Sequence, residues 1–550
     1  MKVEGSRMKR NFMISPFIEG LSIWRFMEKV PLRLEVCSAS FVIMITCLGA
    51  GFRIYNLGAK SLWYDEALDW LVAQGKTLGE VVFTNARAVQ APPLFPVMLH
   101  FTSVFGQSEI AVRAIPVIAG IASIPCIYLL SLSMNPSRVA ACLSALLLAL
   151  APSQVMYSQI VREYSLTVLL TILTILLLVR YITMPSTRRL ILLVGLQIAD
   201  LLTQYGLALL VAACSCATVC YVFRKRERPS TKRVLLWLTG QLVLGGISLF
   251  LIFSSLRWQI EAVAEMSKTS LRQAFWEFGS LSSLVHLLFV NSWRLVEFAT
   301  SYDSRLLTGL FLLLGGLVAV RSNRRQLILL LLTLPFVVTI AAALLRLYPY
   351  TPGRYEIFLT VPIYLLVGWG GGYLLTVNRD RLAVMFLIGI VAVNNFIGPS
   401  ISTTWRYLQS PGWEESGPLV TTLRSEIRDD DIVFVNFGAV PAFLYYWCHS
   451  VGCDSSLLAD GHRRILGGDY IDERNTKVVL GASALRDGKV DQRFSAEQVA
   501  SVLSRRERTW LLFSHTGESE EEIIALARGF GRVVERQREN GASLYVLYPN

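Results

Sequence analysis

Repeated apolar runs of about 18 to 24 residues constrain this chain more than any other feature of its sequence. An α-helix of about 20 apolar residues crosses a hydrocarbon layer of roughly 30 Å. The sequence therefore predicts a polytopic α-helical membrane protein with about eleven transmembrane helices. The runs lie near residues 34–55, 110–133, 139–156, 160–183, 190–205, 206–223, 234–256, 303–320, 326–345, 355–377 and 382–399.

The composition agrees with a membrane protein. Hydrophobic residues make up 53% of the 550 residues and charged residues only 17%, whereas soluble domains carry roughly 25% charged residues. The formal net charge of +12 does not indicate nucleic-acid binding, because the basic residues stand in short clusters between apolar runs. Such clusters are typical of cytoplasmic loops.

The basic clusters also predict an orientation. They occupy alternate loops, on the same side as the basic N-terminal segment 1–33. The positive-inside rule therefore makes residues 1–33 cytoplasmic and residues 56–108 the first external loop. The first apolar run is too long for a signal peptide, so we expect it to remain as a span of the plasma (inner) membrane. An odd number of spans places the C-terminus outside as well.

The chain divides into a membrane domain, residues 34–404, and a more polar C-terminal domain, residues 405–550. Strands and helices alternate in the second part, which predicts an extracytoplasmic α/β domain with a largely parallel sheet. Substrate capture, partner docking and structural cover all remain open as its role. We predict strands at 431–435, 477–481, 509–514 and 543–548, and helices at 441–447, 495–504 and 519–529.

Two of the nine cysteines stand apart from the apolar runs. Cys448 and Cys453 lie in the polar C-terminal region, where an external location favours a disulfide bond between them. Two unpaired thiols are the alternative. The other cysteines behave as small hydrophobic residues, and no spacing of histidine and cysteine indicates a zinc site.

The external loop contains the strongest candidate for a chemical site. Asp65 and Glu66 follow an aromatic pair close to the first span, and carboxylates near a bilayer are costly unless they are paired or functional. The alternative is a solvated loop whose Trp63 and Tyr64 anchor the membrane interface. We expect short helices at 67–73 and 94–105, separated by two prolines that end the first helix region.

Arginines on the external side run against the charge bias and therefore need a reason. Arg162 lies at the junction of two spans, and Arg354 begins a late one. A membrane-embedded anion such as a lipid phosphate supplies that reason, because a guanidinium group binds phosphate with two hydrogen bonds. The alternative is snorkelling towards the headgroups.

Four stretches together resemble a known family. The segment Leu62–Ala67 is similar to the Asp-Glu loop of membrane glycosyltransferases with the GT-C fold, in the branch of protein O-mannosyltransferases, aminoarabinose transferases and galacturonosyl transferases of bacterial envelopes. Ala91–Phe95 resembles the Pro-Pro-Leu stretch that follows this loop. Tyr157–Tyr164 and Gly353–Tyr355 resemble its later Tyr-Ser-Gln and Arg-Tyr motifs. The resemblance covers about residues 35 to 400.

The resemblance implies a sugar donor carried on a polyprenyl phosphate and used at the outer face of the membrane. It makes Asp65 the general base, with Glu66 supporting it, in a single inverting displacement. Arg162 and Arg354 would hold the lipid phosphate together with Tyr164 and Tyr355. Trp63 and Gln159 belong to the same motifs and complete the expected substrate-binding set. The acceptor is a lipid, a polysaccharide or a protein.

The sequence also departs from the family pattern. Ala91 stands where the family often has histidine, and Ile160 replaces its usual glutamate. A divalent metal is therefore left open, with His286 as a loose candidate ligand, and no cofactor is certain. The main alternative function is a flippase or transporter of lipid-linked sugars, although no two-halved repeat is visible and Asp200 is the main ionisable residue within a span. The oligomeric state is left open.

Overall fold

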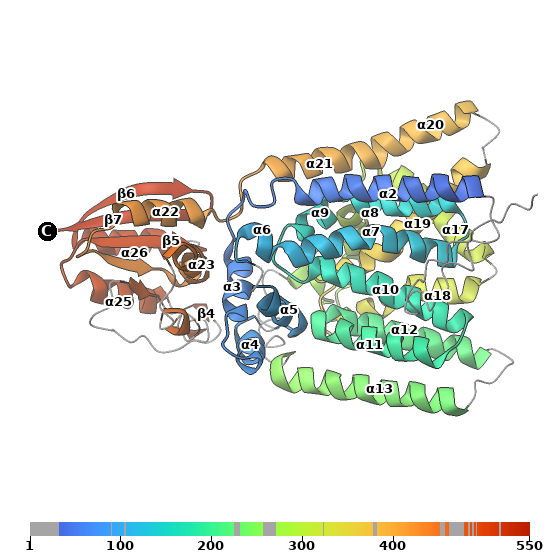
Figure 1. Ribbon diagram of the computed structural model, residues 1–550, viewed down its shortest axis with the longest axis horizontal. Helices are drawn as coiled ribbons and strands as arrows, with labels where there is room; N and C mark the ends of the chain where they lie inside the picture. The colour runs from blue at the N-terminus through green and yellow to red at the C-terminus, as the bar shows by residue number, and fades with distance from the viewer. Residues whose placement is uncertain are drawn as a thin grey trace, which may run out of the picture.

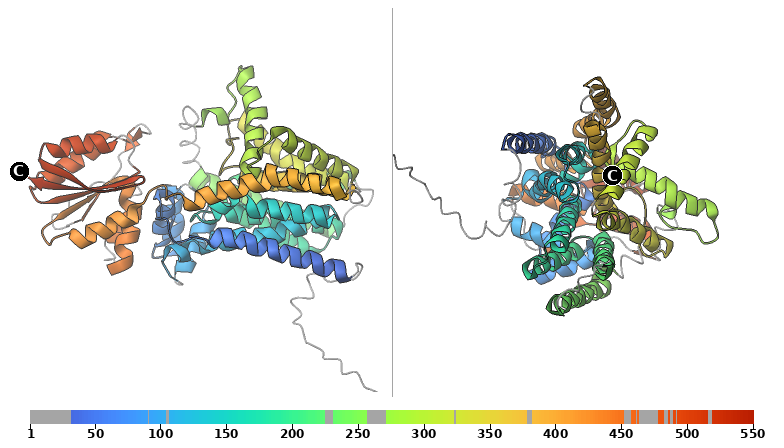
Figure 2. Two further views of the ribbon diagram at one scale, coloured as in Figure 1. Left: turned by 90° about the horizontal axis from the view of Figure 1, so that it is seen from above. Right: turned by 90° about the vertical axis from the view of Figure 1, so that its right-hand side faces the viewer.

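A computed structural model shows a bundle of long helices with an α/β unit at one end of its long axis (Figure 1, Figure 2). Helix α2 (Leu32–Ile54) begins at the end of the bundle far from this unit. The predicted cytoplasmic segment 1–33 lies almost wholly outside the described residues. The structure describes residues 32–550 except 90, 104–105, 225–230, 257–270, 323, 378–381, 452–456, 461, 463–477, 482–484, 487–488, 491 and 516–518.

Every apolar run that predicts a span contains helix. By length and composition, however, the described residues contain six helices able to cross a membrane, or up to eight if each bent pair is one span. The chain is thus a multi-pass membrane protein, while the number eleven stays a prediction. After α2 come α7 (Ala114–Met134), α8 (Arg138–Leu150), α9 (Pro152–Ser158), α10 (Tyr164–Thr183), α11 (Thr187–Thr203), α12 (Gly206–Arg224), α13 (Thr231–Leu251), η3 (Ile252–Leu256), α17 (Arg305–Arg321), α18 (Arg325–Leu344), η6 (Ile357–Leu359), α19 (Thr360–Val377), α20 (Leu382–Ala392), η7 (Val393–Ile397) and α21 (Gly398–Gln409).

One predicted span is broken. Helices α8 and α9 meet at an angle of 56°, and Pro152 stands at the first position of α9. Proline has no N–H to continue the ladder of α8 and restricts the residue before it, so the helix axis changes direction there. Helix α21, in contrast, continues past the predicted domain boundary at residue 404 to Gln409.

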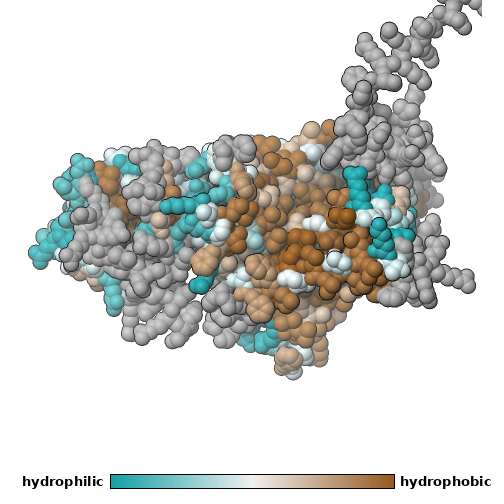
Figure 3. Space-filling view, turned by 60° about the horizontal axis from the view of Figure 1, so that its bottom comes forward, coloured by the Kyte–Doolittle hydropathy of each residue, from teal (hydrophilic) through white to brown (hydrophobic). Residues whose placement is uncertain are grey.

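Hydrophobic residues cover the helical bundle on the face shown in Figure 3, and hydrophilic residues gather over the α/β unit and at the opposite end. Large apolar side chains of the bundle helices are highly exposed, among them Leu242, Leu306 and Phe386. A contiguous apolar surface of this kind on a helical bundle is the surface that faces lipid.

Helix α19 is packed closely between α8 and α17. A side chain at Gly370 would collide with the backbone carbonyl of Phe311 in α17, and one at Gly368 would collide with Ser144 in α8. Small residues let helix backbones approach in a membrane, where dispersion contacts rather than water drive association. The glycines therefore hold α19, which follows directly after the Arg354 segment, in one position.

The segments predicted to be external consist of short helices. The first loop contains α3 (Tyr64–Ala73), α4 (Leu78–Thr84), η1 (Asn85–Val89), α5 (Leu94–Thr102) and α6 (Glu109–Val112). Both helices predicted in this loop are present, but α3 begins three residues earlier than expected and so includes Asp65 and Glu66 in its first turn. A later loop contains η4 (Arg272–Ala274), α15 (Leu281–Val285), η5 (His286–Val290) and α16 (Asn291–Thr300).

The C-terminal unit contains a five-stranded sheet in the order β2-β1-β5-β7-β6. Strands β1, β2 and β5 pair in parallel, whereas β5, β7 and β6 pair antiparallel. The prediction of a largely parallel sheet is therefore wrong. Strand β6 is a polar edge strand, and polar side chains on both faces hide it from hydrophobic patterning. The elements are α22 (Ser416–Glu426), β1 (Ile432–Val435), η8 (Phe437–Ala439), α23 (Val440–Val451), β2 (Val478–Leu480), β3 (Leu485–Arg486), β4 (Lys489–Val490), α25 (Gln492–Leu503), β5 (Thr509–Ser514), α26 (Ser519–Arg528), β6 (Gly531–Glu539) and β7 (Ala542–Pro549).

The two faces of this sheet have different partners. On one face Phe434, Leu511 and Leu547 pack against α25 and α26. On the other face Trp510 and Leu544 share a core with α22, α23 and the first loop, which contains α3. Alternate strand residues point to opposite faces, which explains the division. The C-terminal unit and the first loop therefore bury one common hydrophobic core.

Cys448 forms a disulfide bond. Its predicted partner, Cys453, lies outside the described residues, so the pairing between these two cysteines stays a prediction.

Candidate active site

The structure brings together two of the predicted functional residues from opposite ends of the membrane domain. Arg354 Nη1 lies 3.1 Å from Asp65 Oδ2. The pair is only partly covered, with 22% of the Asp65 side chain and 41% of the Arg354 side chain exposed. A carboxylate and a guanidinium group thus meet at a surface that a substrate can reach.

Glu66 has a different environment from its neighbour. Its carboxylate accepts hydrogen bonds from Arg113 Nε over 3.1 Å and from Arg113 Nη2 over 3.0 Å. The backbone N–H of Val161 donates to the same group over 2.8 Å, and both charged side chains are almost fully buried. Arg113 also donates to the carbonyls of Leu57 and Lys60. This geometry suits a positioning residue that anchors the loop, not contact with a substrate.

Arg162 is buried in an ion-pair cluster. Its Nη1 lies 3.2 Å from Asp69 Oδ2, and its Nε lies 3.5 Å from Glu163 Oε2. Asp69 stands one helical turn after Asp65, and sequence reasoning missed it although the i, i+4 spacing places both on one face of a helix. Burial raises the pKa of Asp69, and the neighbouring Arg162 opposes this effect.

Tyr164 connects the two arginine clusters. It lies within electrostatic range of Arg162, Arg354 and Asp65, and its ring packs edge-on against Tyr157 with centroids 4.7 Å apart. The predicted base, both predicted phosphate-binding arginines and Tyr164 therefore gather in one region of the molecule.

The segment around Arg354 is held by hydrogen bonds to its backbone. Gln204 Nε2 donates to the Arg354 carbonyl over 3.0 Å, and the Tyr348 hydroxyl donates to the Tyr355 carbonyl over 2.9 Å. The Arg354 guanidinium lies 5.4 Å from the Tyr355 ring centroid. These contacts fix the backbone while leaving the Arg354 side chain partly free. The fully buried carboxylate of Glu356 adjoins this segment, and sequence reasoning did not single it out.

Trp63 and Gln159 lie in a separate group. Both line a small cavity of about 30 Å³ that also contacts Glu66, Arg113 and Lys60. Gln159 Nε2 donates to three carbonyls at the end of α2, and the Trp63 ring packs edge-on against Trp413 at 4.7 Å. Burial lowers the pKa of Lys60 to about 8, with Arg113 adding to the effect. The contacts of Trp63 and Gln159 hold the loop in place.

The C-terminal unit supplies partners that sequence reasoning did not find. The backbone N–H of Ser61 donates to Glu415 Oε2 over 3.0 Å. The N–H of Leu62 donates to the Tyr446 hydroxyl over 2.8 Å, and the N–H of Tyr64 donates to Glu414 Oε2 over 2.8 Å. No short-range pattern points to these residues, because 350 to 384 positions separate each from its partner. The loop that carries Asp65 is therefore fixed from the C-terminal side.

The described residues do not assemble a metal site. Among the described residues, no group of three or more histidine, cysteine, aspartate or glutamate side chains is arranged to hold a metal ion. His286 lies in η5, and its Nε2 is buried without a hydrogen-bond partner in that part of the chain. We therefore derive no catalytic step that uses a metal.

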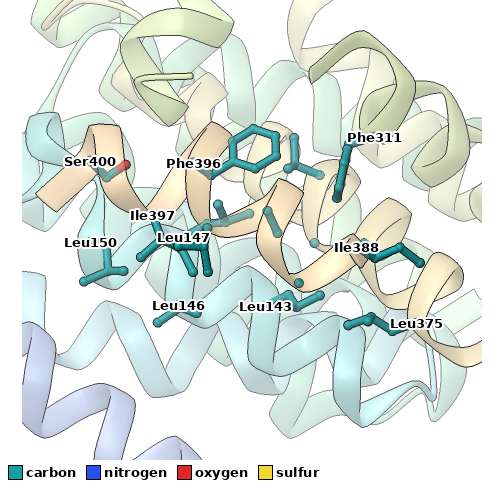
Figure 4. A pocket seen from close by; sticks show the side chains of 16 residues that line it. Leu143, Leu146, Leu147, Leu150, Phe311, Leu375, Ile388, Phe396, Ile397 and Ser400 are labelled. Atoms are coloured by element: carbon teal, nitrogen blue, oxygen red, sulfur yellow. The ribbon is translucent and has the colours of Figure 1, made fainter. Parts of the chain in front are cut away.

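Another cavity, of about 190 Å³, is apolar. It lies among α8, α17, α19 and the continuous helix α20–α21, and its lining includes Leu147, Phe311 and Phe396 (Figure 4). None of the charged residues of the candidate site lines it. Because it offers no titratable group, this cavity suits a hydrocarbon chain rather than bond-making chemistry.

Comparisons with known proteins identify the fold. Residues 90–253 match the family model of dolichyl-phosphate-mannose-protein mannosyltransferases. The structure resembles ArnT from Cupriavidus metallidurans bound to undecaprenyl phosphate, with a TM-score of 0.56 and 10% identity over 94% of this chain and 98% of that one.

The chain has the GT-C fold. The apo state of the same ArnT gives a TM-score of 0.56 at 11% identity, covering 93% of this chain and 98% of ArnT. The Archaeoglobus fulgidus oligosaccharyltransferase in its apo form gives 0.52 at 11% identity, over 89% of this chain and 71% of the other. No curated protein sequence matches the chain. The predicted resemblance to glycosyltransferases of the protein mannosyltransferase and ArnT type is confirmed at the level of the fold.

The family match includes Pro92–Pro93 and Tyr157–Tyr164, but neither Asp65 nor Arg354. At 10–11% identity the structural likeness establishes the fold alone. The substrate must therefore be argued from the site.

Proposed function

We propose that this protein is a membrane glycosyltransferase that moves a sugar from a polyprenyl-phosphate donor to an acceptor of the cell envelope. The observation that carries the proposal is the partly exposed Asp65–Arg354 pair, which sets a base beside a cation suited to phosphate. Two comparisons support the lipid class. The matching family model is named for a dolichyl-phosphate mannose enzyme, and the ArnT structure holds undecaprenyl phosphate.

In the proposed reaction Asp65 takes the proton of the acceptor hydroxyl group. The acceptor oxygen forms a bond to the anomeric carbon as the bond from that carbon to the phosphate oxygen breaks. The electron pair remains on the departing polyprenyl phosphate, whose charge Arg354 stabilises. A single displacement of this kind inverts the anomeric centre.

The pairing of Asp65 with Arg354 suggests an order of events. A donor phosphate beside Arg354 competes with Asp65 for the same guanidinium group. Donor binding would therefore release the Asp65 carboxylate to accept a proton. Arg162 lies in its buried cluster with Asp69 and Glu163. Tyr164 lies near both arginines, and Tyr355 lies beside Arg354.

The proposed reaction takes place on the outer face of the membrane. The basic loops support this orientation, because the positive-inside rule assigns them to the cytoplasm. Helix α2, which follows the basic N-terminal segment, begins at the end of the bundle opposite to the α/β unit, whereas the Asp65 loop contacts that unit (Figure 1).

The variant Asp65→Asn tests the proposal. We expect transfer to fall by about 10²- to 10⁴-fold, the usual contribution of a general base. The assay supplies membrane vesicles with polyprenyl-phosphate sugars of neutral hexose, uronic acid and amino-pentose type, each radiolabelled in the sugar, and follows label into lipid, polysaccharide and protein fractions.

Asp303→Asn serves as the matched control, because Asp303 is an exposed aspartate in another external loop. Transfer by Asp65→Asn at the wild-type rate would contradict the base assignment. Movement of labelled donor across vesicles without transfer to any fraction would favour a flippase.

A further inference from the structure

Glu414 links the C-terminal unit to the first turn of α3. One of its oxygens, Oε2, accepts the backbone N–H of Tyr64 over 2.8 Å and the Ser514 hydroxyl over 3.3 Å. Its other oxygen lies 2.6 Å from His515 Nδ1. The Glu414 carboxylate is thus shared between two domains and is almost fully buried.

The contact has the chemistry of a helix cap supplied from elsewhere in the chain. The first N–H groups of an α-helix have no partner within the helix. Trp63, at the capping position of α3, makes no side-chain hydrogen bond there. Glu414 fills this role, and its negative charge is favourable at the positive end of the helix dipole.

His515 completes the contact from the other side. Its imidazole ring stacks on the Tyr64 ring with centroids 4.6 Å apart and an angle of 10° between the planes. Its backbone lies in the left-handed region, with φ of 56°, a conformation that costs energy for a residue other than glycine. The stack and the Glu414 contact hold the side chain in this position. The C-terminal unit therefore holds both the backbone and the ring of Tyr64.

We propose that Glu414 and His515 form a positioning pair through which the C-terminal unit orients Asp65. Tyr64 is the residue directly before Asp65, so fixing its backbone and ring sets the direction of the Asp65 side chain towards Arg354. The catalytic consequence rests on the function proposed above. The pair acts through Tyr64 and does not itself take part in the chemistry.

The strength of the contact between Glu414 and His515 depends on the protonation of His515. The hydrogen bond with Glu414 raises the pKa of His515 above its ordinary value, burial acts in the opposite direction, and Asp65 adds to the increase. Among the described residues, Glu414, Asp65 and Tyr64 are the titratable groups that face the ring. A raised histidine pKa adds stability that is fully present below the unfolded pKa and is lost as pH rises through the folded pKa. We therefore expect the contacts that hold Tyr64 to weaken as the pH rises through the pKa of His515 in the folded protein.

Hydrogen exchange tests the pair without any substrate. In purified full-length protein, we expect protection of the backbone amides of residues 61–73 to fall about fivefold as pH rises from about 6 to 8.5, after correction for intrinsic exchange. A charge-assisted hydrogen bond is roughly twice as strong as a neutral one, which sets this magnitude. His515→Gln and Glu414→Gln should both remove the pH dependence.

Tyr446→Phe is the matched control. It removes another hydrogen bond of 2.8 Å between the C-terminal unit and this loop, at Leu62, without changing a charge. We expect this variant to keep the wild-type pH dependence. If His515→Gln also keeps it, or if Tyr446→Phe loses it, the proposal is overturned.

A transfer assay then tests the catalytic consequence. With the radiolabelled donors named above, His515→Gln and Glu414→Gln should lower kcat about three- to tenfold and flatten its alkaline decline, with KM for the donor unchanged. An unchanged kcat profile in both variants would overturn the link to Asp65. Failure of the proposed function is separate, because it would appear as full activity of Asp65→Asn.

Discussion

Two neighbouring carboxylates in the first turn of α3 form two very different ion pairs. Glu66 and Arg113 are sealed, with 3% of each side chain exposed, and backbone groups use their remaining hydrogen-bonding capacity. Asp65 and Arg354 meet at a single contact and stay partly open. The difference shows how one dipeptide serves two purposes: the sealed pair sets the position of the loop, and the open pair is available for chemistry.

The physical reason is the direction of consecutive side chains in a helix. Neighbouring residues point about 100° apart, so Asp65 and Glu66 cannot share one environment. Losing one partner of a buried pair leaves an uncompensated charge, whereas losing one partner of an exposed pair costs little stability. The two pairs should therefore respond in opposite ways to the same kind of substitution.

The largest effect on stability is expected at the sealed pair. Glu66→Gln should lower the free energy of unfolding by about 3–5 kcal/mol, because the Arg113 charge stays buried without its partner. Thermal unfolding of the purified protein measures this change, with Asp65→Asn expected within about 1 kcal/mol of wild type. The double variant Glu66→Leu with Arg113→Met should recover part of the loss. If Glu66→Gln and Asp65→Asn had equal melting temperatures, the two ion pairs would not differ in their contribution to stability.

The next effect concerns the open pair. Arg354→Lys keeps the positive charge but loses the planar fork that binds phosphate, so we expect transfer to fall about 10- to 100-fold with an unchanged melting temperature. Arg294→Lys is a suitable control, because Arg294 is an exposed arginine on α16. A variant Arg354→Lys with full activity would show that the guanidinium group does not bind the donor phosphate.

The smallest effect is expected at His286. No group of three metal ligands forms among the described residues, so His286→Ala should leave transfer within about twofold of wild type. Washing the vesicles with EDTA should have equally little effect. A strong loss in both experiments, restored by a divalent cation, would place a metal near η5 and require a different mechanism.

The membrane region was largely predictable from the sequence, because apolar runs report burial in lipid directly. The sequence singles out Asp65, Arg162 and Arg354 for a related reason, because charged residues are uncommon next to a bilayer. The same logic did not reveal Arg113, which precedes a span and resembles an ordinary flanking charge. Because the sequence does not identify Arg113 as the partner of Glu66, it does not predict the structural role of Glu66 either.

Other parts of the site could not be found in this way. Glu414 and His515 lie in a polar region, where one more acidic residue or histidine carries no signal. Their importance comes from contacts with Tyr64 across 350 or more positions. Strand β6 was missed because an edge strand exposes polar side chains on both faces. The pattern of hydrophobic residues along the sequence indicates which residues are buried, and it is a weak signal for residues that are only partly buried.

The hydrophobic core shared by the first loop and the C-terminal unit has a consequence for biogenesis. Leu62 and Trp70 pack into the same core as Leu544 and Val546 of strand β7. Nearly the whole polypeptide must be synthesised before this core can close, and contacts so distant in sequence form slowly. The Asp65 loop would acquire its final shape only at the end of synthesis. A chain that stops short of β7 should therefore lack an organised site even when its spans are inserted correctly, which keeps unfinished molecules inactive.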